Sequence, residues 1–336
     1  MFPCVRSGTR LAAAWLVAGA LALGAVACGD SDSADVASTP PPQPAKPEDF
    51  PSAKGKTLRD LLGDYGSSGP VVVASVSQLE PGDNRFGFAL FDRARAQIAD
   101  APVVLYVAPV GGGRVQGPIP ARFERMDVKP QFESRSVEED EDAAKSLYVA
   151  DIELPKPGRY ELLGLARLDG RVVAAKPAGG ALTVVKDGPV PEVGEAAPVV
   201  NTDTLASANG DLESIDTRRP PSSMHDVDFA EVAGRKPTVL LFATAALCQS
   251  RVCGPVIDVT EQVKAERGDE VAFVHQEIFV DNQIDKGMRP PVAAFNLPTE
   301  PWAFVVGADG RVAARFEGAF SAEELNAAID TAVGKS

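Results

Sequence analysis

The hydrophobic pattern of this chain changes once, near residue 188, and that change constrains the fold most. Before it, in residues 70–187, apolar residues form short runs separated by glycine, proline and aspartate. After it, long apolar runs alternate with segments whose apolar residues recur at helical spacing. The first pattern is typical of strands joined by turns, and the second of buried strands and helices. We therefore expect two folded domains of different class, residues 70–187 and residues 188–336.

The first of these domains is predicted to be an all-β sandwich. Its expected strands are 71–77, 86–91, 103–107, 121–126, 147–153, 160–168 and 182–185. Several short strands bounded by turn residues are typical of an antiparallel sandwich. The stretch 148–160 also resembles the late hairpin of bacterial immunoglobulin-like modules. This resemblance implies an immunoglobulin-like fold and a role as a spacer or as a module that binds a partner.

The N-terminus has the pattern of a secretory signal. Arg6 and Arg10 precede an uncharged apolar run, 11–27, which is shorter than the roughly 20 residues of a membrane-spanning helix. The end of this run and the residue after it, 23–28, resemble a bacterial lipobox. That resemblance implies that Cys28 becomes the lipid-modified first residue of the mature chain. We expect residues 1–27 to be removed and the protein to be anchored on the extracytoplasmic face of the cell membrane.

Residues 28–69 are predicted to form a tether. The segment 30–52 is rich in serine, aspartate and proline and has very few apolar residues, so it favours an extended spacer. A short helix is expected within 54–66, where Leu58, Leu61 and Leu62 recur at helical spacing.

The charge of the chain excludes several classes of partner. Lysine and arginine total 33 and aspartate and glutamate 47, for a formal net charge of −14. Removal of residues 1–27 takes away two arginines and no acid, which leaves −16. This balance argues against nucleic acid and against electrostatic binding to anionic lipid. The acidic run 138–142 is interpreted as a solvated loop and the glycines 111–113 as a hairpin tip, and we expect no cofactor.

The four cysteines have separate fates in this interpretation. Cys4 leaves with the signal and Cys28 carries lipid, so only Cys248 and Cys253 remain as thiols, in a compartment where a disulfide can persist. They follow the apolar run 238–243 and precede a helical pattern that starts just after Pro255. A helix N-terminus and Arg251 would both favour a thiolate there.

The order of elements after residue 193 is strand, helix, strand, hairpin and final helix. The expected strands are 238–243, 271–279, 302–306 and 311–316, and Ser321 with Glu324 predicts a capping box at the last helix.

Together with the stretches 193–198, 242–244 and 301–310, this order resembles extracytoplasmic thioredoxin-like proteins. The resemblance implies an α/β thioredoxin-like fold with Pro301 as a cis-proline beside the active-site sulfurs. It also implies thiol–disulfide exchange with client proteins through Cys248 and Cys253, with Cys248 as the attacking sulfur.

The cysteine spacing departs from that family and leaves three functions open. Four residues separate the cysteines where the family has two, and Leu247 replaces its tryptophan. The first function is thiol–disulfide exchange. The second is copper handling, as in the copper chaperones of cytochrome oxidase assembly, with Cys248, Cys253 and His275 as ligands. In the third, the disulfide is structural and the protein is a non-catalytic binding scaffold. The sequence also argues against a peroxidase, because that family places a threonine three residues before its cysteine and Thr244 lies four residues before Cys248.

Overall fold

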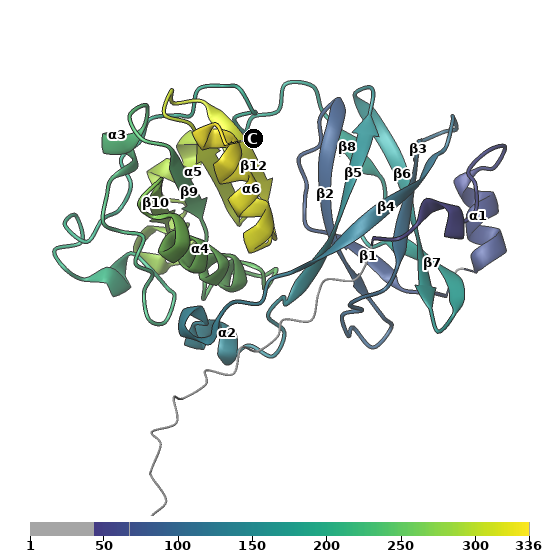
Figure 1. The fold of residues 1–336 in the computed structure, drawn as a ribbon, viewed down its shortest axis with the longest axis horizontal. Helices are drawn as coiled ribbons and strands as arrows, with labels where there is room; N and C mark the ends of the chain where they lie inside the picture. Colours follow the sequence, from purple (N-terminus) through teal and green to yellow (C-terminus); the bar gives the residue numbers. More distant parts are fainter. Residues whose placement is uncertain (1–43, 67, 336) are drawn as a thin grey trace, which may run out of the picture. The chain divides into compact units, whose positions relative to one another are not determined.

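A closed ring of seven strands forms the first half of the computed structural model, which describes residues 44–66 and 68–335 (Figure 1). The strands of this half are β1 (Val71–Ala74), β2 (Gly82–Phe91), β3 (Val103–Pro109), β4 (Gln116–Arg125), β5 (Ser146–Leu154), β6 (Gly158–Leu168), β7 (Arg171–Pro177) and β8 (Leu182–Val184). Their order is β3-β4-β5-β2-β1-β7-β6, and β6 pairs with β3 to close the barrel. Strand β8 adds to β6 outside the ring, and among the strands described for this half only β1 and β7 pair in parallel.

Side chains fill the interior of this barrel. Phe86, Phe88 and Leu90 of β2 are fully buried. The ring of Tyr148 on β5 lies 5.4 Å from that of Phe88 and 5.3 Å from that of Phe123. Small barrels close around such a packed core because inward side chains alternate with outward ones along each strand.

The expected immunoglobulin-like sandwich is wrong. Seven of the eight strands lie where the sequence predicts them, but β7 was missed. This strand pairs with β6 on one side and with β1 on the other, so it joins what would otherwise be two separate sheet edges. It is hard to predict because Arg171, Lys176 and Pro177 lie at its ends and two of its four apolar residues are alanines, which are depleted in strands.

The second half is built on a four-stranded sheet of order β10-β9-β11-β12. Its strands are β9 (Thr238–Phe242), β10 (Ala272–Gln276), β11 (Trp302–Val306) and β12 (Val312–Glu317). Strands β9 and β10 run parallel, and the other pairs are antiparallel. Residues Val239 and Leu241 of β9 face a core that contains α4 (Cys253–Arg267) and α6 (Ala322–Val333). The alternate residues, Leu240 and Phe242, face α3 (Phe229–Val232), α5 (Pro290–Ala294) and loops.

The expected thioredoxin-like α/β fold is also wrong. Several local predictions are confirmed in kind: the strand expected at 238–243, the hairpin after Pro301 and the capping box of Ser321 with Glu324. The strand expected at 271–279 is shorter, and the helix expected just after Pro255 already begins at Cys253. The described chain as a whole is mostly β, however, with a closed barrel beside a small second sheet. Of the helices that the structure places beside this sheet, only α4 and α6 are longer than five residues. Periodicity and capping set single elements, whereas their assembly depends on long-range packing.

The end of the predicted tether packs on the barrel. Helix α1 (Leu58–Tyr65) confirms the helix expected within 54–66, and a capping box of Thr57 with Asp60 starts it. Before it, η1 (Pro47–Asp49) leads into the buried Phe50. The hydroxyl of Tyr106 on β3 donates to the carbonyl oxygen of Pro51 at 2.6 Å.

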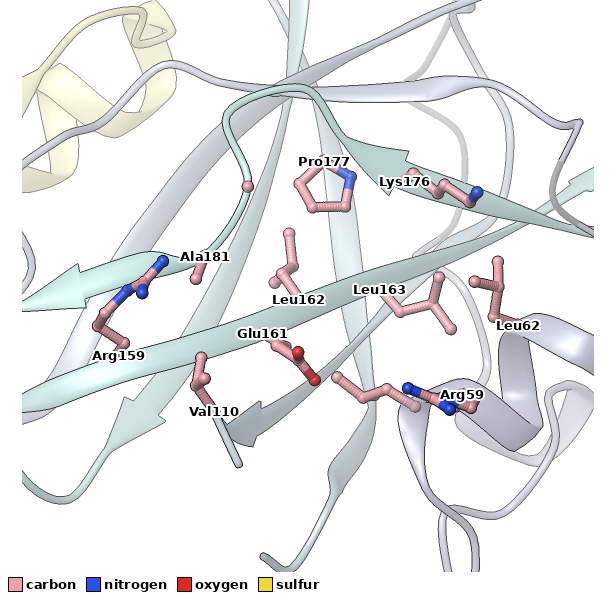
Figure 2. A pocket seen from close by; sticks show the side chains of 12 residues that line it. Arg59, Leu62, Val110, Arg159, Glu161, Leu162, Leu163, Lys176, Pro177 and Ala181 are labelled. Carbon is pink, nitrogen blue, oxygen red and sulfur yellow. The ribbon is translucent and has the colours of Figure 1, made fainter. Parts of the chain in front are cut away.

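A cavity of about 510 Å³ lies beside α1, over β6 and the end of β7 (Figure 2). Leu62, Leu162 and Leu163 give it apolar walls, and Arg59 and Lys176 line its rim. No cysteine or histidine of the described chain lines this cavity, so it is separate from the chemistry of the second half.

The barrel and the second sheet share contacts. Met126, Leu147 and Val149 from the barrel side pack into the same core as α4 and α6. The guanidinium of Arg85 on β2 pairs with Glu324 of α6 at 2.7 Å. Among the helices that the structure describes, none combines the length and apolar character needed to cross a membrane.

Candidate functional site

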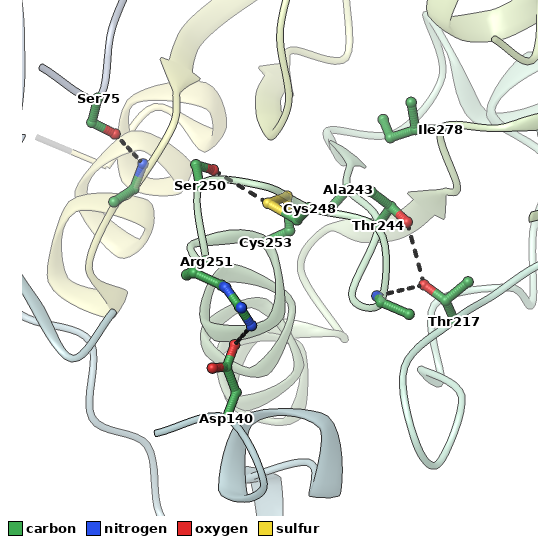
Figure 3. Close-up of a disulfide and its surroundings, with 12 residues drawn as sticks. Ser75, Asp140, Thr217, Ala243, Thr244, Cys248, Ser250, Arg251, Cys253 and Ile278 are labelled. Carbon is green, nitrogen blue, oxygen red and sulfur yellow. Dashed lines mark hydrogen bonds and ion pairs between the residues drawn. A yellow bond between two sulfur atoms is a disulfide. The ribbon is translucent and has the colours of Figure 1, made fainter. Parts of the chain in front are cut away.

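Cys248 and Cys253 form a disulfide in the loop between β9 and α4 (Figure 3). Their Cα atoms are 6.0 Å apart. Cys253 is the first residue of α4 and is fully buried. Cys248 is only half-buried, and its Sγ lies 3.2 Å from the hydroxyl of Ser250. The sulfur of Cys248 is therefore the one that an external thiol can reach.

The start of α4 suits a thiolate on Cys253. The N-cap is Val252, and no side chain in the described part of the chain caps this end. The first turn of the helix also contains no acidic residue. The unpaired N–H groups of a helix N-terminus carry a partial positive charge, which lowers the pKa of a thiol placed there.

Arg251 does not have the role expected for it. Its guanidinium Nη1 donates to Oδ2 of Asp140 at 2.8 Å, as Figure 3 shows. The backbone of Arg251 also accepts a hydrogen bond from the N–H of Ala144 at 3.0 Å. Because Asp140 lies in the acidic run 138–142, that run is not merely a solvated loop. The carboxylate of Asp140 pairs with the guanidinium that was expected to favour a thiolate on the cysteines.

The connection between β4 and β5 covers one side of the disulfide. It contains η2 (Pro130–Phe132) and α2 (Arg135–Glu138). The side chain of Val137 in α2 packs on α4 at Gly254. The contact is so close that a Cβ atom placed on Gly254 would lie 3.0 Å from Cγ2 of Val137. A cavity of about 40 Å³ remains between this connection and Cys248, which leaves room for a few water molecules at most. A client sulfur would therefore approach from the exposed side, where Gln249 and Ser250 lie.

A buried carboxylate holds the other side of the cysteine loop. Glu277, fully buried, accepts hydrogen bonds from the N–H and the hydroxyl of Thr217, at 3.0 and 2.8 Å. The hydroxyl oxygen of Thr217 in turn accepts from the N–H of Ala246 at 3.1 Å. The loop that carries Cys248 is thus fixed to the sheet through Thr217.

Both histidines of the chain meet at a second cluster, next to this loop. Nε2 of His225 and Nδ1 of His275 lie 3.0 and 3.2 Å from the same oxygen, Oδ2 of Asp216. All three residues are buried. Burial alone would raise the pKa of Asp216, but the charge and hydrogen bonds of the two imidazoles, His275 foremost, lower it well below its usual range. Burial likewise opposes a charge on His275, yet Asp216 outweighs burial and raises the pKa of His275.

No family model matches this chain. The curated proteins contain no match to it either. The site must therefore be interpreted from its own geometry.

The structure places the predicted site residues in three groups. Cys248 and Cys253 are joined by a disulfide. The peptide bond before Pro301 is cis. Pro301 directly precedes β11, and the first residue of that strand, Trp302, pairs with Phe242 of β9. His275 instead belongs to the Asp216 cluster, and in the described chain neither cysteine joins a group of metal-binding side chains. Cys28 lies outside the described residues.

Asp216 and His225 were missed because nothing in their spacing links them to His275. The one available signal was that the chain has two histidines in all.

Proposed function

We propose that this protein exchanges thiols and disulfides with client proteins through Cys248 and Cys253. One observation carries the proposal: the disulfide joins a partly exposed cysteine in a loop to a buried cysteine at the first position of a 15-residue helix. In this arrangement the sulfur of Cys248 is the one that is attacked, and the sulfur of Cys253 is the one that leaves. Exchange rates depend on access to the attacked sulfur and on the stability of the leaving thiolate.

In the oxidising direction, a client thiol loses its proton to solvent and its thiolate attacks Sγ of Cys248. A bond forms between the client sulfur and Cys248, the bond between Cys248 and Cys253 breaks, and the electron pair leaves on the sulfur of Cys253. The helix N-terminus stabilises that thiolate. A second client thiolate then attacks the client sulfur and releases Cys248. Two electrons pass to the cysteine pair, and the client gains a disulfide.

The reducing direction uses the same steps in reverse. The thiolate of Cys248 attacks a client disulfide, and Cys253 then attacks Cys248 and releases the reduced client. Copper handling has less support, because both ring nitrogens of His275 face partners other than the cysteines. A purely structural disulfide is the remaining alternative.

The reduction potential of the Cys248–Cys253 pair tests the proposal. We expect a potential above roughly −300 mV and turnover of a model disulfide in the presence of a reductant, because exchange proteins have more oxidising potentials than structural disulfides. Cys248→Ser should abolish the turnover, whereas Ser250→Ala, which removes only the hydroxyl beside Cys248, should retain it. A potential well below this value, with no turnover, would show that the disulfide is structural.

We also propose that the protein acts at the extracytoplasmic face of the membrane, held there by lipid on Cys28. The signal-like pattern of residues 6–28 supports this location. Mass spectrometry of the mature protein should find a lipid-modified Cys28 at the N-terminus. An unmodified Cys28, or a signal that remains attached, would contradict the anchor.

A further inference from the structure

The outer nitrogens of the two buried histidines both face backbone carbonyls. Nδ1 of His225 lies 3.2 Å from the carbonyl oxygen of Asp203. Nε2 of His275 lies 3.1 Å from the carbonyl oxygen of Ala243. A carbonyl oxygen only accepts hydrogen bonds, so each of these outer nitrogens carries a hydrogen. In a neutral imidazole the inner nitrogen then has a free lone pair.

The two inner nitrogens point at one carboxylate oxygen. Nε2 of His225 and Nδ1 of His275 lie 3.0 and 3.2 Å from Oδ2 of Asp216. Two lone pairs and a negative charge would thus face one another in the interior, where unpaired polar groups are costly. The hydroxyl of Ser222, 3.1 Å from Nδ1 of His275, can donate to that ring, but in the described chain Nε2 of His225 has no partner other than Oδ2 of Asp216. A cation, either a proton or one metal ion among the three atoms, resolves this arrangement.

We propose that Asp216, His225 and His275 bind a divalent transition metal ion of the zinc type. The ligand atoms are Oδ2 of Asp216, Nε2 of His225 and Nδ1 of His275, which lie within 4.8 Å of one another. The hydroxyl of Ser222 lies 3.1 Å from Nδ1 of His275, beside the three ligand atoms. Imidazole and carboxylate ligands in a four-coordinate site are typical of zinc, whereas calcium and magnesium prefer oxygen ligands alone.

The groups around the cluster orient its side chains as partners around a bound metal ion do. Ligating histidines generally donate their other N–H to a carbonyl or carboxylate, as both rings do here. The carboxylate is oriented by two backbone donors, the N–H of Ser222 at 2.7 Å on Oδ2 and the N–H of Arg218 at 2.8 Å on Oδ1. These contacts fix the orientation of each ligand before the ion binds.

The position of the cluster gives the ion a structural role. Residues 197–228 form a long connection whose only helix, in the described structure, is η3 (Leu212–Ser214). Long connections with so little secondary structure are uncommon in compact folds. Two of the three ligand residues lie on this connection and His275 lies on β10, so the ion would tie the connection to the sheet. It would also hold Thr217, which supports the cysteine loop.

Metal analysis of the purified protein tests the site. Because the ligands are buried, the ion must bind as the chain folds, so the protein is refolded from urea with zinc chloride and then freed of loosely bound metal. We expect about one zinc per chain in the wild type and in Ser223→Ala, whose hydroxyl bonds to Glu261 instead of facing the cluster. His225→Gln and His275→Gln should retain less than about a tenth of that amount.

Two further measurements keep the test decisive. The Cys248→Ser/Cys253→Ser double variant should retain its zinc, which separates this site from binding by reduced thiols and from the failure of the exchange activity. Wild type refolded with a chelator should melt at least about 5 °C below wild type refolded with zinc, even if the histidine variants do not fold. Equal melting temperatures, a wild type without zinc, or zinc that is lost only from the cysteine variant would each overturn the proposal.

Discussion

Replacing Cys253 with serine is expected to stop the exchange reaction halfway and leave the client bonded to Cys248. The reduced wild type should react with an aromatic disulfide, dithiodipyridine, to release two equivalents of aromatic thiol and reform its own disulfide. Cys253→Ser should release one equivalent and retain the other as an adduct, because no second thiol is held near Cys248 to resolve it.

Cys248→Ser is the matched control for this experiment. Cys253 is fully buried at the start of α4, so its reaction with the same reagent should be at least about tenfold slower. Mass spectrometry of the two variants counts the adducts, and absorbance of the released thiol gives the rates. Equal rates in the two variants would contradict the assignment of Cys248 as the attacking sulfur.

Replacing Arg218 with leucine is expected to lower the free energy of unfolding by about 3–5 kcal/mol. Nε of Arg218 donates to Oδ1 of Asp258 at 2.8 Å, and both side chains are almost completely buried. Nη2 of Arg218 donates to the carbonyl oxygen of Phe132 at 2.8 Å, and Oδ2 of Asp258 accepts from the N–H of Ser134 at 2.8 Å. The pair therefore joins α4, the 197–228 connection and the β4–β5 connection, and its loss leaves Asp258 charged in the interior.

The neighbouring residue provides the control. Arg219 pairs with Glu139, but both side chains are more than half exposed, so Arg219→Leu should change the free energy of unfolding by less than about 1 kcal/mol. Urea unfolding compares the two variants. Removing both charges, in Arg218→Leu/Asp258→Leu, should recover part of the loss, since no unpaired charge then remains. Equal unfolding midpoints for Arg218→Leu and Arg219→Leu would refute the role of the buried pair.

Local elements of this fold could be predicted from the sequence where periodicity and capping determine them. The continuous run at 238 gave β9, and Ser321 with Glu324 gave the start of α6. The overall architecture could not be predicted in the same way. Strand β7 has only four central apolar positions between charged ends, yet its parallel pairing with β1 is needed to complete the barrel. That pairing joins residues about a hundred positions apart, which no local pattern records.

The same difference between local features and long-range contacts applies to the candidate site. The positions of Cys248 and Cys253, five apart, and of Pro255 were enough to predict a possible disulfide near the start of a helix, and this disulfide is present. The residues that contact the site could not be predicted from the sequence. Asp140 binds Arg251 from a segment more than a hundred residues earlier, and Asp216 meets His275 across the sheet edge. Such contacts arise only when the connections fold over the sheet.

The connection between β4 and β5 also bears on how such a chain can evolve. Three of its residues contact the second half: Ser134 donates to Asp258, Val137 packs at Gly254, and Asp140 pairs with Arg251. A recombination event that severed the gene near residue 188 and gave the second half a new upstream partner would remove all three contacts at once. The transplanted half would keep both cysteines but lose the surroundings of the helix that carries one of them. We therefore expect the barrel and the cysteine loop to be inherited together, as a single unit of selection.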